Sequence, residues 1–249
     1  MTRRRWIADK WDEATATLKG AQAEHMIRVL RTLPGVEADV VAGGRVFHSV
    51  VARILDEGQD GTAEVRFNLV AEVEAEPGMP VTLVMSIFKF DHMEWAIEKA
   101  TELGVASVAP VIARRTEKHL ALAAMKRVER WRRIALEASQ QSRRSDVPVI
   151  HDPAKLTDHV KATSHRKRLV LAEQERSTTL RGALAEVIAA AGAEMPELEL
   201  AIGPEGGWAP EEEALLDAHG WQAVSLGPRI LRAETAAIAA LAVVASMLE

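Results

Sequence analysis

Five mostly apolar runs, each of strand length, alternate with helical segments in the sequence after residue 80. Strands of this kind are typical of a parallel sheet that is buried on both faces, because helices cover each side. The alternation therefore predicts an α/β domain with a mostly parallel sheet. The five predicted strands are residues 81–88, 105–113, 168–172, 198–202 and 222–226.

Helices are predicted between and after these runs, at residues 91–104, 124–141, 179–191, 210–219 and 233–248. The first has Asp91 at its predicted N-cap and Glu94 three residues further on, which is the spacing of a capping box. The last is rich in Ala, Val and Leu. We interpret it as a core helix or a dimer interface, since it is Ala-rich and interrupted by Ser246.

Residues 1–74 have a different pattern, with short β-leaning pieces broken by turn signals such as Gly43-Gly44. Such spacing favours a small β-barrel or sandwich. The stretch AEPGMP, residues 75–80, belongs to neither pattern and indicates a domain boundary. Two domains are therefore expected, over residues 1–74 and 75–249.

Cysteine is absent, so disulfides and thiolate metal sites are excluded. No apolar run has the length needed to span a bilayer. A cytoplasmic protein without a membrane partner or a metal is expected. Apart from His25, the histidines lack the spacing of metal ligands and are interpreted as surface or loop residues; these are His48, His92, His119, His151, His159 and His165.

The formal net charge of −5 hides a local asymmetry. Residues 114–144 hold ten Lys and Arg against three Glu, and a phosphate backbone responds to such a stripe rather than to the total charge. A second basic cluster, Arg3 to Arg5, precedes Trp6. The alternative for the stripe is a solvated helix face, which is the more common reason for a run of charges.

Two glycine-bearing loops near the end of the chain, GPEGG (203–207) and LGPRILRAETA (226–236), follow predicted strands. Ligands of parallel sheets gather at the carboxyl ends of strands, and glycines allow a flat ligand to lie against the main chain. Glu205 and the acidic start of the next helix disfavour a phosphate ligand. A neutral or cationic ligand is expected, with a tight strand-to-helix turn as the alternative.

The second loop places Arg229, Arg232 and Glu234 beside a very apolar helix. Charged side chains there are costly unless they pair with each other or meet a ligand. A structural ion pair of Glu234 with Arg229 or Arg232 is the alternative to a functional role.

These two motifs together resemble the RsmE-type methyltransferases of the SPOUT superfamily. The resemblance extends to His25 with VLR at 29–31, to Lys89, to KATELGV at 99–105 and to QQSRRSDVP at 140–148. The sequence departs from the family pattern at a few positions, which are Trp6, Gln140, Arg143, Asp146 and Trp208.

The resemblance implies methylation of uridine N3 in 16S ribosomal RNA of the small subunit, with S-adenosylmethionine (SAM) as cofactor. It implies a PUA-like RNA-binding barrel over 1–74, a SPOUT domain over 75–249 whose end forms a trefoil knot, and a homodimer. The cofactor residues it implies are Leu171, Ala172, Ile202, Gly203, Pro204, Glu205, Gly206, Gly207, Leu226, Gly227, Ile230, Leu231 and Ala236.

For the reaction, Arg232 is expected to stabilise negative charge on the uracil oxygens, while Glu234 orients Arg232 or acts as the base. Two other functions stay open, a ribose 2′-O-methyltransferase and a catalytically silent RNA-binding assembly factor. The residues expected to contact RNA are Arg3, Arg4, Arg5, Arg31, Arg114, Arg115 and Arg144.

Overall fold

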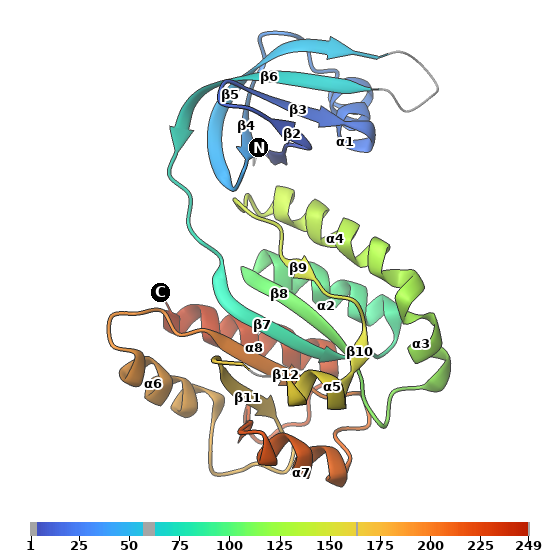
Figure 1. Ribbon diagram of the computed structural model, residues 1–249, viewed down its shortest axis with the longest axis vertical. Coiled ribbons are helices and arrows are strands. Elements are labelled where there is room, and N and C mark those ends of the chain that lie inside the picture. The colour runs from blue at the N-terminus through green and yellow to red at the C-terminus, as the bar shows by residue number, and fades with distance from the viewer. Residues whose placement is uncertain (1–3, 57–62, 163, 249) are drawn as a thin grey trace. The chain divides into compact units, whose positions relative to one another are not determined.

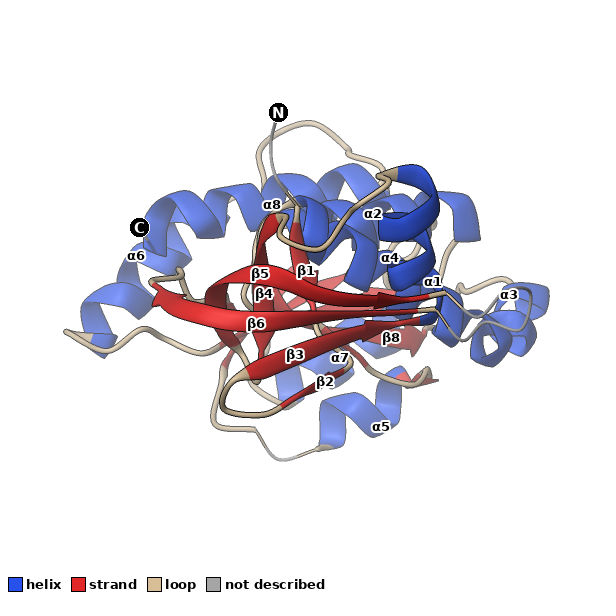
Figure 2. Cartoon of the chain, turned by 90° about the horizontal axis from the view of Figure 1, so that it is seen from above, coloured by secondary structure: helices blue, strands red, loops and turns tan. Residues whose placement is uncertain are grey.

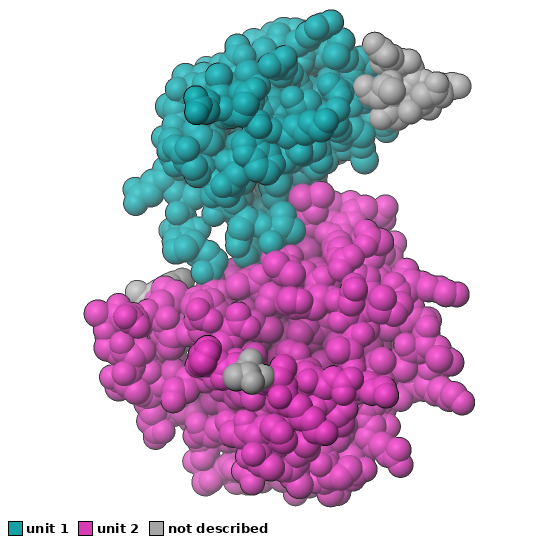
Figure 3. All heavy atoms as spheres, in the orientation of Figure 1, with its two compact units in different colours: residues 1–78, 139–147 teal, residues 79–138, 148–249 magenta. Residues whose placement is uncertain are grey.

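The computed structural model describes residues 4–56, 63–162 and 164–248. Two compact units divide the chain, one formed by residues 1–78 with 139–147 and the other by 79–138 with 148–249 (Figure 3). The first unit thus includes a segment, 139–147, that the expected division after residue 74 places in the second domain.

The first unit is built on a six-stranded sheet with the order β1-β4-β5-β6-β3-β2 (Figure 1). β1 and β4 are parallel, and the other neighbours are antiparallel. The elements are β1 (Arg5–Ile7), β2 (Lys10–Trp11), β3 (Thr15–Lys19), α1 (Gly20–Glu24), a π-helical turn (His25–Val29), β4 (Glu37–Ala42), β5 (Arg45–Leu55) and β6 (Glu64–Val73).

The sheet of the first unit is curled, and its core is small. Two register shifts between β5 and β6 allow the long strands to bend. The β4–β5 connection uses Gly43 and Gly44, both with positive φ, as the predicted tight turn requires. Trp6, Leu18 and Phe67 are among the buried side chains on the concave side. The predicted β-rich character of this part of the chain is confirmed.

The second unit alternates strands and helices, as predicted. Its elements are β7 (Met79–Ser86), α2 (Phe90–Glu102), β8 (Val105–Ile112), α3 (Lys118–Ala123), a 3₁₀ turn (Ala124–Arg127), α4 (Val128–Gln141), β9 (Val149–Ile150), β10 (Ala154–Lys155), α5 (Leu156–Lys161), β11 (Lys167–Leu171), α6 (Leu180–Ala191), β12 (Leu198–Ile202), α7 (Pro210–Ala218), β13 (Gln222–Val224) and α8 (Ala233–Leu248). The last turn of α4 belongs to the first unit.

All strand pairs of the second sheet are parallel, in the order β10-β8-β7-β12-β11-β13 with β9 beside β8 (Figure 1). Figure 2 shows the strands of both units in red and their helices in blue. β12 is buried at every residue. Val84, Val170 and Ala201 pack against α5 and α7, and their strand neighbours, which point to the opposite side, face the layer of α2, α6 and α8. The predicted α/β class is confirmed.

The predicted capping box of the helix after β7 is wrong. α2 begins at Phe90, its N-cap is Lys89, and no side chain caps it. Glu94 instead pairs with two arginines of the following segment, with Nε of Arg130 at 2.8 Å and Nη1 of Arg127 at 3.5 Å. The Glu94 carboxylate therefore forms ion pairs with these arginines, although its spacing from Asp91 predicts a capping role at the start of the helix.

Among the described helices, none is both long enough and apolar enough to cross a membrane. α8, the most apolar of the long helices, lies against α2, α6 and the strands β7 and β12. Ala237, Ala240, Leu241 and Val244 are buried there, in agreement with the interpretation of α8 as a core helix.

His159 in α5 gives the second unit a pH-dependent stability. Burial lowers the pKa of this imidazole from the usual 6.5, and the carboxylate of Glu199 opposes that effect. The unfolded chain therefore binds a proton where the folded chain does not, and stability is lost as the pH falls below about 6.5. The loss corresponds to about 1.4 kcal/mol for each unit of pKa difference.

We expect the free energy of unfolding, measured in urea, to drop between about pH 7.5 and 5.5, and to drop less in His159→Gln. His165→Gln serves as the matched control, because His165 is exposed. Equal drops in the wild type and His159→Gln would contradict this explanation.

Candidate functional site

Three loops meet at the carboxyl ends of β11, β12 and β13 and enclose a cavity of about 510 Å³. Because these strands are adjacent and parallel in the sheet, the segments that follow them leave at one edge. The lining comes mostly from residues 171–174, 202–208, 224–227 and 229–233, and is completed by Lys89, His92, Arg115, Arg176, Glu213 and Ala236. A cavity of this size is typical of a small-molecule site.

The GPEGG loop is held from both sides. Trp208 closes its carboxyl end, with the indole Nε1 donating to the carbonyl of Leu171 at 3.1 Å. A Cβ on Gly203 would lie 3.2 Å from the Trp208 ring, so the loop needs a glycine there. On the outer side, Nη1 of Arg115 donates to the carbonyl of Gly206 at 2.5 Å.

The second loop is fixed by main-chain bonds to the segment after β11. Ser225 N donates to the carbonyl of Thr178, and the Ser225 carbonyl accepts from Leu180 N. The Ser225 hydroxyl accepts from Gly227 N at 3.1 Å. Gly227 has φ +117, a backbone region that side chains disfavour. Leu226 to Leu231 can therefore line the cavity with main-chain as well as apolar atoms.

A carboxylate also orders the loop after β11. Hydrogen bonds from the Ser177 hydroxyl, and from the amides of Thr178 and Ser177, lower the pKa of Glu175 to about 2. Glu175 is therefore ionised at neutral pH and caps the turn that leads to α6. The neighbouring residues Glu173, Gln174 and Arg176 line the cavity.

The alternative of a structural ion pair between Glu234 and Arg229 or Arg232 is not what the structure has. In the described part of the chain, neither Arg229 nor Arg232 lies within 4.0 Å of a carboxylate oxygen. Glu234, which is 4% exposed, faces His92 of α2, with Oε1 at 3.6 Å from Nδ1. Arg229 and Arg232 both line the cavity. Glu234 lies behind the cavity wall rather than in it.

All the residues predicted to hold the cofactor line this one cavity, from Leu171 to Ala236. Sequence reasoning missed Arg115, Trp208 and His92 as members of the site. His92, interpreted as a surface or loop residue, lies in α2 and is half-buried, with Nδ1 buried. Within residues 4–56, 63–162 and 164–248, no group of three or more His, Asp or Glu could hold a metal ion.

The residues predicted to bind RNA differ in how accessible they are. Arg3 lies outside the described residues. Arg4 and Arg31 are exposed, and Arg31 has a φ of 51° at the end of the π-helical turn. A side chain in this backbone region is strained, which is often seen at functional positions. Arg31 also borders a second cavity of the first unit, beside Arg53.

Two further predicted RNA contacts are engaged inside the first unit. Arg5 donates to the carbonyl of Arg143, and burial followed by the charge of Arg143 lowers the pKa of Arg5. Arg144 is buried and pairs with Asp146 at 2.9 Å. Arg143 has φ 64, a conformation that suits glycine, and reaches Asp39 at 3.0 Å.

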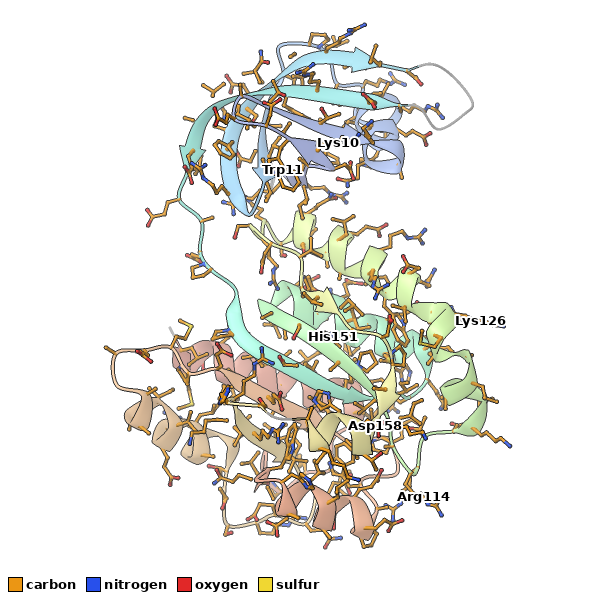
Figure 4. All side chains as sticks on the ribbon, viewed as in Figure 1. Lys10, Trp11, Arg114, Lys126, His151 and Asp158 are labelled. Atoms are coloured by element: carbon orange, nitrogen blue, oxygen red, sulfur yellow. The ribbon has the colours of Figure 1, made fainter. Side chains whose placement is uncertain are left out.

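Most of the basic residues between 114 and 144 also form ion pairs with carboxylates. Arg130 and Arg127 hold Glu94, and Arg132 reaches Glu129 and Asp152. Arg114 is exposed and points away from the ribbon (Figure 4), and its Nε lies 3.7 Å from Oε1 of Glu211, which is also exposed. Lys126, on the 3₁₀ turn before α4, also stands out from the ribbon (Figure 4).

Residues 75–245 match the model of a family described as the RNA methyltransferase domain. A relative from Synechocystis, named ribosomal RNA small subunit methyltransferase E, is 36% identical over 239 residues, which cover 95% of this chain and 75% of the relative. The chain belongs to the methyltransferase E family. A Bacillus subtilis relative of the same name is 28% identical, with 94% of this chain and 91% of the relative covered.

Solved structures place the methyltransferase E fold over the whole chain. A Neisseria gonorrhoeae methyltransferase E bound to S-adenosyl methionine has a TM-score of 0.79 at 28% identity, and 98% of each chain is covered. A putative methyltransferase from Legionella pneumophila, in complex with the bound cofactor SAM, has a TM-score of 0.81 at 29% identity, with 99% of this chain and 98% of that chain covered.

Gly203→Ala tests the contact that shapes the first loop of this methyltransferase E family member. The added methyl would lie 3.2–3.4 Å from the Trp208 ring, so we expect a loss of about 1–3 kcal/mol in unfolding free energy. Combining it with Trp208→Phe should cost less than the sum of the two single variants. If the losses of unfolding free energy, measured in urea, are additive, the methyl group at residue 203 does not clash with the Trp208 ring.

Proposed function

We propose that this chain uses SAM to methylate N3 of a specific uridine in 16S ribosomal RNA of the small subunit. One observation carries the proposal: every residue predicted for the cofactor, together with Arg232, lines a single cavity at the carboxyl ends of parallel strands. Membership in the methyltransferase E family supports the rRNA substrate. The choice of N3 rests on the likeness of LGPRILRAETA to RsmE-type methyltransferases.

The chemistry of the cavity fits the cofactor. When bound, SAM supplies a methyl group from a positively charged sulfonium centre. Glu205 gives the cavity a carboxylate suited to that charge, while Gly227, where a side chain would meet nothing within 4 Å, leaves main-chain atoms open to a flat base. Leu171, Ile202 and Leu231 would hold the apolar parts. A phosphate ligand fits less well, since three Glu follow in the first turn of α7.

Arg232 is the residue we propose for charge stabilisation. Uridine N3 becomes a nucleophile when its proton leaves, and negative charge then spreads to O2 and O4. The Arg232 guanidinium lines the cavity and forms no ion pair with a carboxylate among the described residues. It can therefore interact with O2 and O4. The other residues of the cavity wall have to hold uridine N3 and the methyl group of SAM close together and aligned.

The first unit is proposed as a PUA-like RNA-binding barrel, which its curled six-stranded sheet supports. The exposed Arg4 and Arg31 are the better candidates for phosphate contact, because Arg5 and Arg144 are engaged internally. Arg114 is a further candidate, since its pair with Glu211 at 3.7 Å is solvent-exposed. A trefoil knot at the end of the chain and a homodimer are proposed from the family resemblance. Exposed Ala242 and Ser246 on α8 are small enough for close packing of a second helix.

The deciding experiment incubates the protein with labelled SAM and small subunits that lack the modification, and then identifies the labelled nucleoside. We expect 3-methyluridine at one position. A 2′-O-methylated nucleoside would favour the ribose methyltransferase instead. Absence of label together with no SAM binding in calorimetry would leave an RNA-binding assembly factor.

Arg232→Ala should lower the methylation rate by about 100-fold or more while SAM affinity stays within about threefold of the wild type. The reason is that the guanidinium acts on charge that develops during the reaction. Arg181→Ala, exposed on α6, is the matched control and should behave as the wild type. Near-normal turnover of Arg232→Ala would remove Arg232 from its proposed role.

Arg114 and Arg115 are neighbours with different expected roles. Arg115→Ala should weaken SAM binding by about tenfold, because the Gly206 carbonyl loses its charged donor. Arg114→Ala should leave SAM binding unchanged, weaken RNA binding, and reduce the slope of RNA affinity against salt by about 1. Calorimetry and filter binding measure the two affinities. The same response from both variants would refute this division.

A further inference from the structure

The first turn of α2 meets acidic side chains from both cofactor loops. Nδ1 of His92 lies 3.6 Å from Oε1 of Glu234, at the start of α8, and 4.0 Å from Oε1 of Glu205, in the GPEGG loop. His92 and Glu205 line the cavity. One imidazole therefore stands between two segments that are 29 residues apart in the sequence.

Burial makes this arrangement costly unless a cation completes it. Glu234 is 4% exposed, and a buried carboxylate is destabilising without a charged or hydrogen-bonding partner. Oε2 of Glu234 and Nδ1 of His92 are both buried and have no hydrogen-bond partner among the described residues. His92 is the basic side chain that the structure places within 4.0 Å of this carboxylate.

The other charged groups around His92 are mostly acidic. Oδ2 of Asp91, on the same helix, lies 3.8 Å from Nε2 of His92. Lys89 contributes one cation, with Nζ at 4.0 Å from Oε2 of Glu205. An imidazole pairs electrostatically with such carboxylates only when it carries a proton, and imidazoles gain or lose that proton near neutral pH.

We propose that protonated His92 is a positioning residue that ties the GPEGG loop to the start of α8, and so sets the pH range in which the cofactor cavity is held together. This inference rests on the proposed function in one respect, namely that the cavity binds SAM. Loss of the proton leaves Glu205 and Glu234 without their shared partner, and the two loops separate more easily. SAM affinity then falls as the pH rises.

A different hypothesis is that His92 accepts the N3 proton of uridine. The variant His92→Lys distinguishes this hypothesis from the proposal. Lysine keeps the positive charge over the whole neutral range but is a poor proton acceptor there. His92→Lys should therefore preserve a tie and abolish its pH dependence. His92→Gln removes the charge at every pH.

The test measures SAM affinity by calorimetry between about pH 6 and 8.5 for the wild type, His92→Lys and His92→Gln. We expect wild-type affinity to weaken by about tenfold across this range, His92→Lys to bind tightly throughout, and His92→Gln to bind weakly throughout. His151→Gln, an exposed histidine away from the cavity and labelled in Figure 4, should follow the wild type.

A wild-type pH profile in His92→Gln would overturn the proposal, as would a failure of His92→Lys to restore affinity. Tight SAM binding by His92→Lys with no methylation of small subunits would assign the imidazole to proton transfer, and would overturn it as well. Hydrogen exchange in the free protein gives a readout that needs no cofactor. Residues 203–209 and 233–237 should exchange faster in His92→Gln than in His92→Lys at one pH.

If the wild type does not bind SAM at any pH, the proposed function fails. The exchange comparison still decides whether His92 ties the loops, so the two failures can be told apart. Equal exchange of these segments in both variants would refute the tie even if SAM binds.

Discussion

The parallel pairing of β12 between β7 and β11 is the constraint on which the rest of the second unit depends. Leu198 to Ile202 are buried at every position and are registered with β7 on one side, while Leu198 to Ala201 are registered with β11 on the other. A strand buried on both faces and both edges has little freedom to shift. The loops that follow β11, β12 and β13 must therefore leave at one edge of the sheet, and this edge holds the cavity.

Side-chain contacts then turn that edge into a defined site. Trp208 fills the space above Gly203 and bonds to the end of β11, Arg115 holds the outer carbonyl of the GPEGG loop, and Ser225 anchors the second loop. Each of these contacts gives a main-chain carbonyl or amide a hydrogen-bond partner. Arg232 is left facing the cavity, and Glu234 is held behind its wall by α2.

Charge pairing decides which basic residues can meet RNA. The stripe from 114 to 144 looks like a phosphate-binding surface when charges are counted along the chain, yet most of its arginines pair with carboxylates of the same unit. Such pairs occupy the donors that phosphate would need. The exposed candidates, Arg4, Arg31 and Arg114, lie on loops and element ends, where binding residues are often found. Arg114 also pairs with Glu211 at 3.7 Å, but both side chains are exposed.

The sequence by itself determined the α/β class and the long strands and helices of the second unit, because apolar periodicity is a local property. The resemblance of its two glycine-bearing loops to a known family supplied many of the cavity residues, but not Arg115, Trp208 or His92. Only the tertiary structure decided which charged groups meet. Glu94 binds Arg127 and Arg130 instead of capping α2, and Glu234 faces His92 instead of Arg232. An ion pair depends on distances between segments far apart in the chain, and local patterns do not carry that information.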